Sequence, residues 1–396
     1  MYNVISLFSG AMGLDIGAEK AGATIKVCIE KDKFAAATIR RNTKIPVIES
    51  DINEVSSEKI LEVAGLEKGE VFAIIGGPPC QPFSYAGKQL GLGDFRANTM
   101  VRFLNIIEEI RPKFFLMENV RGLLTAKLNS VPEEFSKYEN IKELPGSVLK
   151  FLKTELKNYG YTVSFALLNA ANYGVPQKRE RMILFGYYGD ERISIPRPTH
   201  SENSIIRNTL PWKTLREALK GLKKPQLSEY NELSDRNKKF LSLLKEGENW
   251  TNLPEDLKKE AMGGAYYLGG GKTGFYRRLS FSQPSPTLVT VPTMPATMLC
   301  HPTELRPLSI KEYARIQEFP DNWIFEGKIT EIYKQIGNAV PIGLGYIAMK
   351  TLIDFYEEKN LIIKYSKYKN TTDIEFDKHF EKIQKKKNEN QNQLKL

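Results

Sequence analysis

The chain has 396 residues, of which 41% are hydrophobic and 26% charged, and this composition excludes a wholly disordered protein. The formal net charge of +10 and the sequence pI of about 9.2 favour a polyanionic partner, most simply nucleic acid. No apolar run approaches the roughly 20 residues that span a bilayer, and the first residues lack the pattern of a signal peptide. We therefore predict a cytoplasmic protein without a membrane segment.

The cysteines and histidines show no spacing typical of a disulfide framework or a metal site. Cys28, Cys80 and Cys300 are odd in number and far apart, and the three histidines are scattered. No HExxH or CxxC pattern occurs. We predict no bound metal ion.

Short β-rich runs alternate with helical patterns over residues 1–186. The expected strands are NVISLF, TIKVCIE, FAIIGG, KFFLMEN, TVSFALLN and RMILFGY. The helical patterns between them include DKFAAATIRRN, NTMVRFLNIIEEI and GSVLKFLKTELKNYG. This alternation predicts βαβ units and a mostly parallel sheet.

The first strand is followed by the glycine-containing turn FSGAMG and a helix, an arrangement typical of nucleoside-binding sites. The spacing differs from the GxGxxG pattern that cradles a pyrophosphate. Glu30 ends the second strand, where an acid can bind ribose hydroxyls, and Asp51 could accept from an adenine amine. These residues indicate an adenosine-containing cofactor, with an ordinary βα turn as the alternative.

The stretch GGPPCQPFS places Cys80 on a stiff loop directly after a buried strand. Pro78, Pro79 and Pro82 restrict the backbone to a path that is neither helix nor strand. In open α/β sheets, ligands bind at the carboxyl ends of the strands. The thiol is therefore either a nucleophile or a small buried apolar group.

The alternating pattern of strands and helices ends near residue 187. Residues 190–300 are irregular and proline-rich, with 17 Lys and Arg against 12 Asp and Glu. Arginines and aromatic residues beside glycines suit either a nucleic-acid surface or a loop-rich β domain with solvated charges. Helical patterns return in LSIKEYARIQEF and IGLGYIAMKTLIDFYEEK. The lysine- and asparagine-rich end predicts disordered last residues.

Six blocks together resemble the bacterial cytosine-5 DNA methyltransferases. They are FSGAMGLDIG, GGPPCQPFS, MENV, QKRERMILFG, RPLSIKEYARIQEFP and IGNAVP, in the order and spacing of that family. The resemblance implies a Rossmann-like α/β sheet with helices on both faces and a smaller, irregular, β-rich target-recognition domain. The large domain would comprise residues 1–186 and 330–396, and the small domain residues 187–329.

The resemblance also implies S-adenosylmethionine as the cofactor. The positions that match the family's cofactor pocket are Phe8, Ser9, Gly10, Gly13, Leu14, Glu30, Asp51, Ile52, Gly76, Pro78, Met100, Asn338 and Val340. The stretch DFRANTM before Met100 holds one residue more than the family pattern.

The catalytic residues implied by the resemblance are Cys80, Glu118, Arg179 and Arg181. Carbon 5 of cytosine becomes nucleophilic only after a thiolate adds to carbon 6, which gives Cys80 its role. Glu118 would bind ring nitrogen 3 and the exocyclic amine. The two arginines would hold the cytosine oxygen and the site geometry.

The target base lies inside the duplex stack, so the enzyme would flip it into the pocket at a cost of a few kcal/mol. Residues 84–93 resemble a loop that closes on DNA. The expected DNA-binding residues are Ser84, Gln177, Arg277, Arg278, Thr287 and Leu288. Arg277 and Arg278 could contact guanines or phosphates. Contact of the lysine-rich end with DNA is a further hypothesis.

The leading interpretation is therefore a monomeric methyltransferase acting on double-stranded DNA, the protective partner of a restriction endonuclease that reads the same site. A transfer-RNA cytosine methyltransferase shares the same blocks, but the long variable region favours DNA. A catalytically silent DNA-binding relative would need to lack a catalytic residue, and all four are present. A nicotinamide-dependent dehydrogenase is disfavoured by the absence of GxGxxG.

Overall fold

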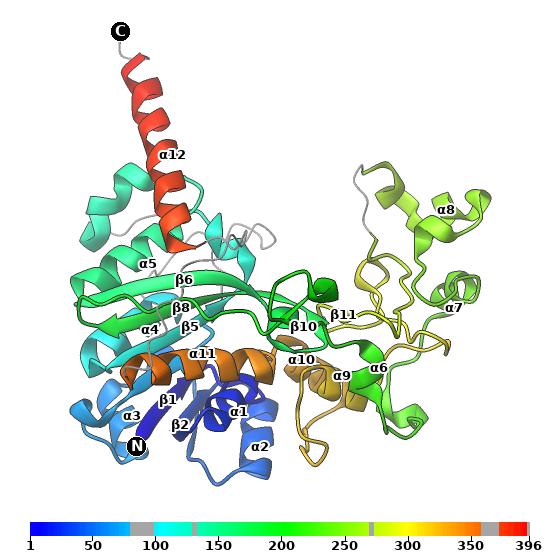
Figure 1. The fold of residues 1–396 in the computed structure, drawn as a ribbon, viewed down its shortest axis with the longest axis horizontal. Helices are drawn as coiled ribbons and strands as arrows, with labels where there is room; N and C mark the ends of the chain where they lie inside the picture. The colour runs from blue at the N-terminus through cyan, green and yellow to red at the C-terminus, as the bar shows by residue number, and fades with distance from the viewer. Residues whose placement is uncertain (80–98, 129–132, 269–272, 358–371, 394–396) are drawn as a thin grey trace.

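The computed structural model describes residues 1–79, 99–128, 133–268, 273–357 and 372–393. A seven-stranded sheet in the order β3-β2-β1-β4-β5-β8-β6 forms its centre (Figure 1). The strands are β1 (Tyr2–Leu7), β2 (Ala23–Glu30), β3 (Val47–Glu49), β4 (Ala73–Gly76), β5 (Phe114–Asn119), β6 (Tyr161–Asn169) and β8 (Glu180–Tyr188). Strand β8 runs in the direction opposite to the other six strands of this sheet. The predicted, mostly parallel sheet is confirmed.

The strands are buried on both faces of the sheet. Successive side chains of a strand point to opposite faces, so each strand contributes to two cores. In β4, Ala73 and Ile75 join the hydrophobic core on one face, whereas Ile74 joins the core on the other. In β5, Phe114 and Phe115 divide in the same way. The near-continuous apolar strands of the sequence are thus explained by helices on both faces.

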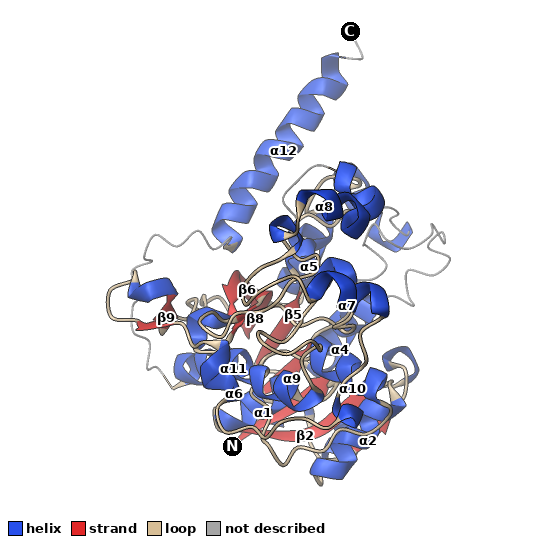
Figure 2. Ribbon diagram, turned by 90° about the vertical axis from the view of Figure 1, so that its right-hand side faces the viewer, coloured by secondary structure: helices blue, strands red, loops and turns tan. Residues whose placement is uncertain are grey.

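Each face of the sheet has its own set of helices (Figures 1 and 2). The first core contains side chains of α1 (Gly13–Lys20), α2 (Lys33–Asn42), α9 (Ile310–Ile316), α10 (Ile329–Asn338) and α11 (Ile342–Tyr356). The second contains side chains of α3 (Ser57–Ala64), α4 (Thr99–Ile110), α5 (Ser147–Asn158) and α12 (Asp373–Gln393). The predicted layers are confirmed.

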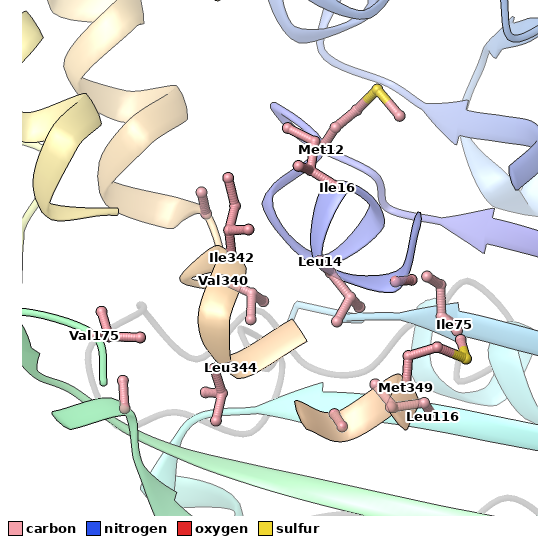
Figure 3. Close-up of a cluster of buried hydrophobic side chains, with 14 of the residues drawn as sticks. Met12, Leu14, Ile16, Ile75, Leu116, Val175, Val340, Ile342, Leu344 and Met349 are labelled. Carbon is pink, nitrogen blue, oxygen red and sulfur yellow. The ribbon is translucent and has the colours of Figure 1, made fainter. Parts of the chain in front are cut away.

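Helices α1 and α11 pack closely although they lie at opposite ends of the sequence. A Cβ added to Gly17 would lie 2.5 Å from both Ile342 O and Tyr346 N, so only glycine permits this contact. Figure 3 shows Leu14 of α1 near Val340 and Ile342 at the start of α11. The contact brings the carboxyl-terminal segment beside the turn that follows β1.

The first residue of β1 and the end of α11 also meet, at the end of the strand opposite to that turn. The Tyr2 hydroxyl donates a hydrogen bond to Glu357, just past the last residue of α11. The rings of Tyr2 and Tyr356 meet edge to face, with centroids 6.2 Å apart. The beginning of the chain and the end of α11 are therefore neighbours.

The small domain is built mainly from loops and short helices, which differs from the predicted β-rich domain. Its strands in the described residues have two residues each, namely β9 (His200–Ser201), β10 (Leu210–Pro211) and β11 (Ser285–Pro286). Its helices are α6 (Leu215–Leu219), α7 (Asp235–Leu241) and α8 (Glu255–Met262). Frequent prolines, which cannot donate a ladder hydrogen bond, explain why longer strands do not form. The domain boundaries at residues 186 and 330 stay a prediction.

The lysine-rich end of the chain forms a long helix, so the prediction of disorder there is wrong for residues 373–393. Phe376 and Phe380 pack into the second core, and Lys153 pairs with Asp377 at 2.6 Å. These contacts anchor the first turns of α12. Farther along the helix, Lys387 Nζ donates to Asn140 O and Lys142 O at 3.2 Å, and the last turn extends away from the body of the protein (Figures 1 and 2).

Among the described residues, one mainly helical stretch, Ile329–Tyr356, is long and apolar enough to cross a membrane by length and composition alone. The share of its most apolar window that is buried inside the protein is 67%. This stretch contains α10 and α11, whose side chains belong to the first core. Its apolar character is therefore accounted for by packing against the sheet.

The close contact of α1 with α11 leads to a stability prediction. Replacing Gly17 with Ala should lower the free energy of unfolding by about 1–3 kcal/mol, because the added methyl group meets backbone atoms that cannot rotate away. Urea denaturation followed by circular dichroism would measure the change. Gly69→Ala is the control, since a Cβ there meets no atom within 4 Å. Equal stabilities of the two variants would contradict the prediction.

Candidate active site and cofactor cavity

A cavity of about 1040 Å³ opens at the carboxyl ends of β1, β2, β4 and β5. Most of the residues predicted to bind the cofactor line it: Phe8, Ser9, Gly10, Gly13, Leu14, Glu30, Asp51, Ile52, Pro78, Asn338 and Val340. Glu118, Arg179 and Arg181 line the same cavity. The structure thus brings the predicted cofactor residues and three predicted catalytic residues together.

The turn after β1 has an unusual backbone that points amide groups toward Glu30. Phe8, Gly10 and Met12 have φ values of 58°, 54° and 70°, in the left-handed region. Gly10 N donates to Glu30 Oε2 at 2.7 Å, and Asp32 N donates to Glu30 Oε1 at 2.7 Å. Burial raises the pKa of Glu30, while these amide hydrogen bonds oppose the rise. The carboxylate is held in one orientation at the cavity wall.

Asp51 lies at the far end of the cavity and is already paired. Its Oδ2 lies 2.6 Å from Lys31 Nζ, and its Oδ1 accepts from Asn53 N at 3.0 Å. The Lys31 hydrogen bond, followed by that from Asn53, lowers the pKa of Asp51. Ile52 beside it is 4% exposed and supplies an apolar surface. An ionised acid next to an apolar wall suits a purine ring with an amino group.

Glu118 forms a buried ion pair with Arg181 at the end of β5. Arg181 Nε lies 2.7 Å from Glu118 Oε1, and the side chains are only 13% and 12% exposed. Burial raises the pKa of Glu118, and the charges of Arg181 and Arg179 oppose that rise. The arginine holds the carboxyl group in place and leaves its second oxygen available.

The loop that follows β4 runs against Glu118. A Cβ added to Gly77 would lie 2.8 Å from Glu118 Oε2, and Asn119 Nδ2 donates to Pro78 O at 3.0 Å. Pro79 lines the cavity. Cys80, the next residue, lies outside the described residues, as do Ser84 and the predicted loop 84–93. The described part of the loop leads the chain to the cavity beside the predicted acid.

Arg179 is a clamp between distant chain segments. The side chain is 1% exposed and donates to Leu288 O at 3.0 Å, Gly337 O at 2.8 Å and Asn338 O at 3.5 Å. Burial, and after it the charge of Arg181, lower the pKa of Arg179, but an arginine remains charged at neutral pH. Its role as a holder of site geometry is visible, because it fixes three carbonyl groups of the cavity wall.

Gln177 has a structural position that differs from the predicted DNA contact. The side chain is fully buried, its Oε1 accepts from Leu288 N at 3.0 Å, and its Nε2 donates to Gln317 Oε1 at 2.8 Å. Gln317 Nε2 donates in turn to Ile336 O and Ala339 O. A side chain without exposed surface cannot touch DNA, so Gln177 supports the cavity wall instead.

Arg278 likewise serves the interior of the small domain. Its guanidinium donates to Leu241 O, His301 O and Glu304 O at 3.1, 3.1 and 2.9 Å. The side chain is 7% exposed, which removes it from the candidates for DNA contact. Arg277 is partly buried, and burial lowers its pKa.

Thr287 and Leu288 lie at the junction of the two domains. Leu288 is 1% exposed and lines the cavity. Thr287 Oγ1 donates to Lys178 O at 2.9 Å, and the residue lines a neighbouring hollow of about 520 Å³ with Arg121 and Arg181. Strand β11 pairs there with β7 (Gln177–Lys178). The segment connects the cavity with a partly basic surface.

Two predicted cofactor residues do not line the cavity. Gly76 ends β4, where a Cβ would lie 2.4 Å from Leu7 O, so glycine permits the close packing of β4 on β1. Met100 is 1% exposed in the second core, and Thr99 lines the cavity in its place.

Sequence reasoning missed several residues of the cavity wall, among them Asp15, Thr99, Thr290 and Lys334. Asp15 could have been noticed as an acid in the first turn of the helix after the glycine turn. Lys334 pairs with Asp32 at 2.7 Å across the cavity mouth, a contact no local pattern indicates. Among the described residues, no group of three His, Cys, Asp or Glu side chains could hold a metal ion.

The cavity fits S-adenosylmethionine. Its walls combine a glycine turn, one carboxylate with an oriented hydrogen-bonding pattern and an acid beside an apolar surface, which match a methionine chain, a ribose and an adenine. Strand β8 is inserted antiparallel between β5 and β6, and the cavity lies at the carboxyl edge of the sheet. These features define an α/β enzyme that binds a nucleoside-containing cofactor.

Comparisons with known proteins identify the family. A family model described as "C-5 cytosine-specific DNA methylase" matches residues 2–354, so the chain belongs to this family. The chain is 39% identical to Type II methyltransferase M.Eco47II of Escherichia coli over 371 residues, with 91% of this chain and 81% of the relative covered. It is 38% identical to Type II methyltransferase M.Sau96I of Staphylococcus aureus, with 91% and 77% covered. The chain is a DNA cytosine-5 methyltransferase.

Solved structures agree on the fold. The S. pombe Dnmt2 methyltransferase has a TM-score of 0.57 and 15% identity, covering 90% of this chain and 98% of its own. A Spodoptera frugiperda DNMT2 structure has a TM-score of 0.56 and 17% identity, covering 89% and 100%. At such identities the likeness supports the fold alone.

The arginine clamp leads to a prediction. Arg179→Lys should lower the free energy of unfolding by about 2–3 kcal/mol, because one ammonium group cannot reach all three carbonyl groups. Urea denaturation of the two proteins would measure it. Arg121→Lys is the control, since Arg121 pairs with Glu180 on the surface and its loss should cost under about 0.5 kcal/mol. Similar losses in both variants would argue against the clamp.

Proposed function

We propose that this chain transfers a methyl group from S-adenosylmethionine to carbon 5 of a cytosine flipped out of duplex DNA at a specific sequence. The observation that carries the proposal is a single cavity that holds the Glu118–Arg181 pair, the chain leading to Cys80 and the Glu30 carboxylate. Relatives named Type II methyltransferases support DNA as the substrate. The enzyme would protect host DNA as a cytoplasmic monomer whose cognate endonuclease acts separately.

The cofactor would bind along the edge of the sheet. Glu30 would accept hydrogen bonds from the ribose hydroxyls, and Asp51 with Ile52 would hold the adenine. The turn at Ser9 and Gly10 and the wall at Asn338 and Val340 would complete the site. Bound S-adenosylmethionine would supply the methyl group that carbon 5 takes up.

The protein residues would activate the cytosine. The Cys80 thiolate would add to carbon 6, forming a carbon–sulfur bond and moving negative charge onto ring nitrogen 3 and carbon 5. Glu118 would share a proton with nitrogen 3; burial raises its pKa and so favours the protonated form that can donate. After carbon 5 is methylated, loss of its proton to a base and departure of the sulfur would restore the ring and free the thiolate.

The small domain would bind the duplex and read its sequence. Its irregular loops reach the cavity at Leu288, Val289 and Thr290, so bases beside the flipped cytosine would lie against this domain. Thr287, which lines the neighbouring hollow, would contact the backbone of the target nucleotide. The positive net charge of the chain favours binding to a polyanion.

Replacing the nucleophile tests the reaction. Bisulfite sequencing of plasmid DNA from cells that express the protein should reveal one short motif whose cytosine resists conversion, and Cys80→Ala should abolish that resistance. The wild-type chain should also form a denaturant-stable complex with duplex DNA carrying 5-fluorocytosine in the motif, because fluorine at carbon 5 cannot leave as a proton does. Methylation by Cys80→Ala at the wild-type rate would contradict the covalent route.

The Glu118 role is tested separately. Glu118→Gln keeps the shape but loses the exchangeable acid, so kcat for methyl transfer should fall about 10²-fold or more. The rate would be measured by transfer of a labelled methyl group to the motif duplex. Glu62→Gln, which alters a surface acid on α3 paired with Lys59, should leave kcat unchanged. A full rate in Glu118→Gln would remove Glu118 from the mechanism.

A further inference from the structure

Asp15 is a buried acid that the proposed reaction leaves without a role. It lies in the first turn of α1, is 0% exposed and lines the cofactor cavity. Neither carboxylate oxygen has a hydrogen-bond partner among the described residues. An unpaired buried carboxylate costs folding free energy unless a partner compensates it. The position of Asp15 therefore indicates a ligand group that supplies the missing hydrogen-bond partners of its carboxylate.

The described residues around Asp15 supply no positive charge to it. Ser6 and Ser9 hydrogen-bond to each other, with their hydroxyl oxygens 2.8 Å apart, and Cys28 is buried nearby. The charged groups that act on Asp15 are the acids Glu19 and Glu30. Burial raises the pKa of Asp15 to about 7, and the nearby Ser6 hydroxyl and the Asp15 amide, neither of which is in hydrogen-bonding geometry with the carboxylate, offset only part of the rise. A cation entering the cavity would meet an acidic environment at this point.

The order of the strands tells which part of the cofactor lies there. The neighbouring strands are, in order, β3, β2, β1, β4 and β5, and four of these five carry an acid at their carboxyl edge. Asp51 follows β3, Glu30 ends β2, Asp15 follows β1 and Glu118 belongs to β5. With adenine at Asp51, ribose at Glu30 and cytosine at Glu118, the end of β1 faces the methionine portion of the cofactor.

We propose that Asp15 binds the α-ammonium group of the methionine portion of S-adenosylmethionine, an inference that rests on the proposed function. A carboxylate without partners needs hydrogen-bond donors. The ammonium group offers three N–H donors and a positive charge, whereas the sulfonium has no hydrogen to donate. Charge-assisted hydrogen bonds of this kind are the stronger ones, so one contact accounts for both the burial and the missing partner.

Calorimetric binding to the full chain tests the proposal with three ligands. S-adenosylmethionine has both the ammonium and the sulfonium, S-adenosylhomocysteine has only the ammonium, and 5′-methylthioadenosine has neither. Asp15→Asn should weaken binding of the first two by roughly 10- to 100-fold and leave that of 5′-methylthioadenosine unchanged. Glu62→Gln is the control, because Glu62 is a surface acid on α3 paired with Lys59 and does not line the cavity. It should leave all three affinities unchanged.

Other outcomes would overturn the proposal. A loss confined to S-adenosylmethionine would assign Asp15 to the sulfonium, and an equal loss for all three ligands would mean that the substitution disturbs the cavity as a whole. Unchanged affinities would remove Asp15 from the site. Failure of the wild-type chain to bind S-adenosylmethionine would instead refute the proposed function.

A measurement on the wild-type chain avoids dependence on the folding of the variant. The analogue of S-adenosylhomocysteine that lacks only the α-amino group should bind the wild-type chain roughly 10- to 100-fold more weakly than S-adenosylhomocysteine. If Asp15→Asn folds, the affinities of the two ligands for that variant should differ much less. Equal affinities of the wild-type chain for the two ligands would overturn the proposal.

Discussion

The architecture depends on a set of buried side chains that satisfy the carbonyl groups at the end of α10. The last carbonyls of a helix have no partner within it and carry partial negative charge. Arg179 donates to Gly337 O and Asn338 O, and Gln317 donates to Ile336 O and Ala339 O. Arg179 also binds Leu288 O. The end of one helix thus becomes the point at which three distant chain segments form a common cavity wall.

The cavity contrasts with the charge of the whole chain. The protein has a net charge of +10, yet the acids that line the cavity, Asp15, Glu30, Asp32, Asp51 and Glu118, outnumber its basic side chains, Lys31, Arg179, Arg181 and Lys334. A methyl donor with a positive sulfonium favours an acidic pocket, whereas a phosphate backbone favours a basic exterior. Arg181 lies where the two requirements meet, since it pairs with Glu118 and also lines the partly basic hollow beside Thr287. The acidic part of the cavity and the partly basic hollow therefore lie only a few residues apart.

The large domain was predictable because its signals are local. Apolar strands alternating with helical patterns indicated the sheet, and the glycine turn and Glu30 indicated one end of the cavity. The small domain was not, because its short helices and two-residue strands follow from tertiary contacts rather than periodicity. Gln177 and Arg278 were assigned to DNA because a polar side chain does not reveal its burial, and α12 was missed because Phe376 and Phe380 are few among polar residues. Met100 lies in the second core, whereas its neighbour Thr99 lines the cavity.

The meeting of Tyr2 with Glu357 has a consequence for the order of the sequence blocks. Strand β1 begins where α11 ends, so a short connection there would close the backbone from β1 to α11 into a ring, with α12 outside it. A new opening could then be made in a surface loop without separating α1 from α11 or Arg179 from α10. The linear order of the six blocks is therefore one choice among several that the same three-dimensional arrangement permits, and a circularly permuted chain would build the same cavity.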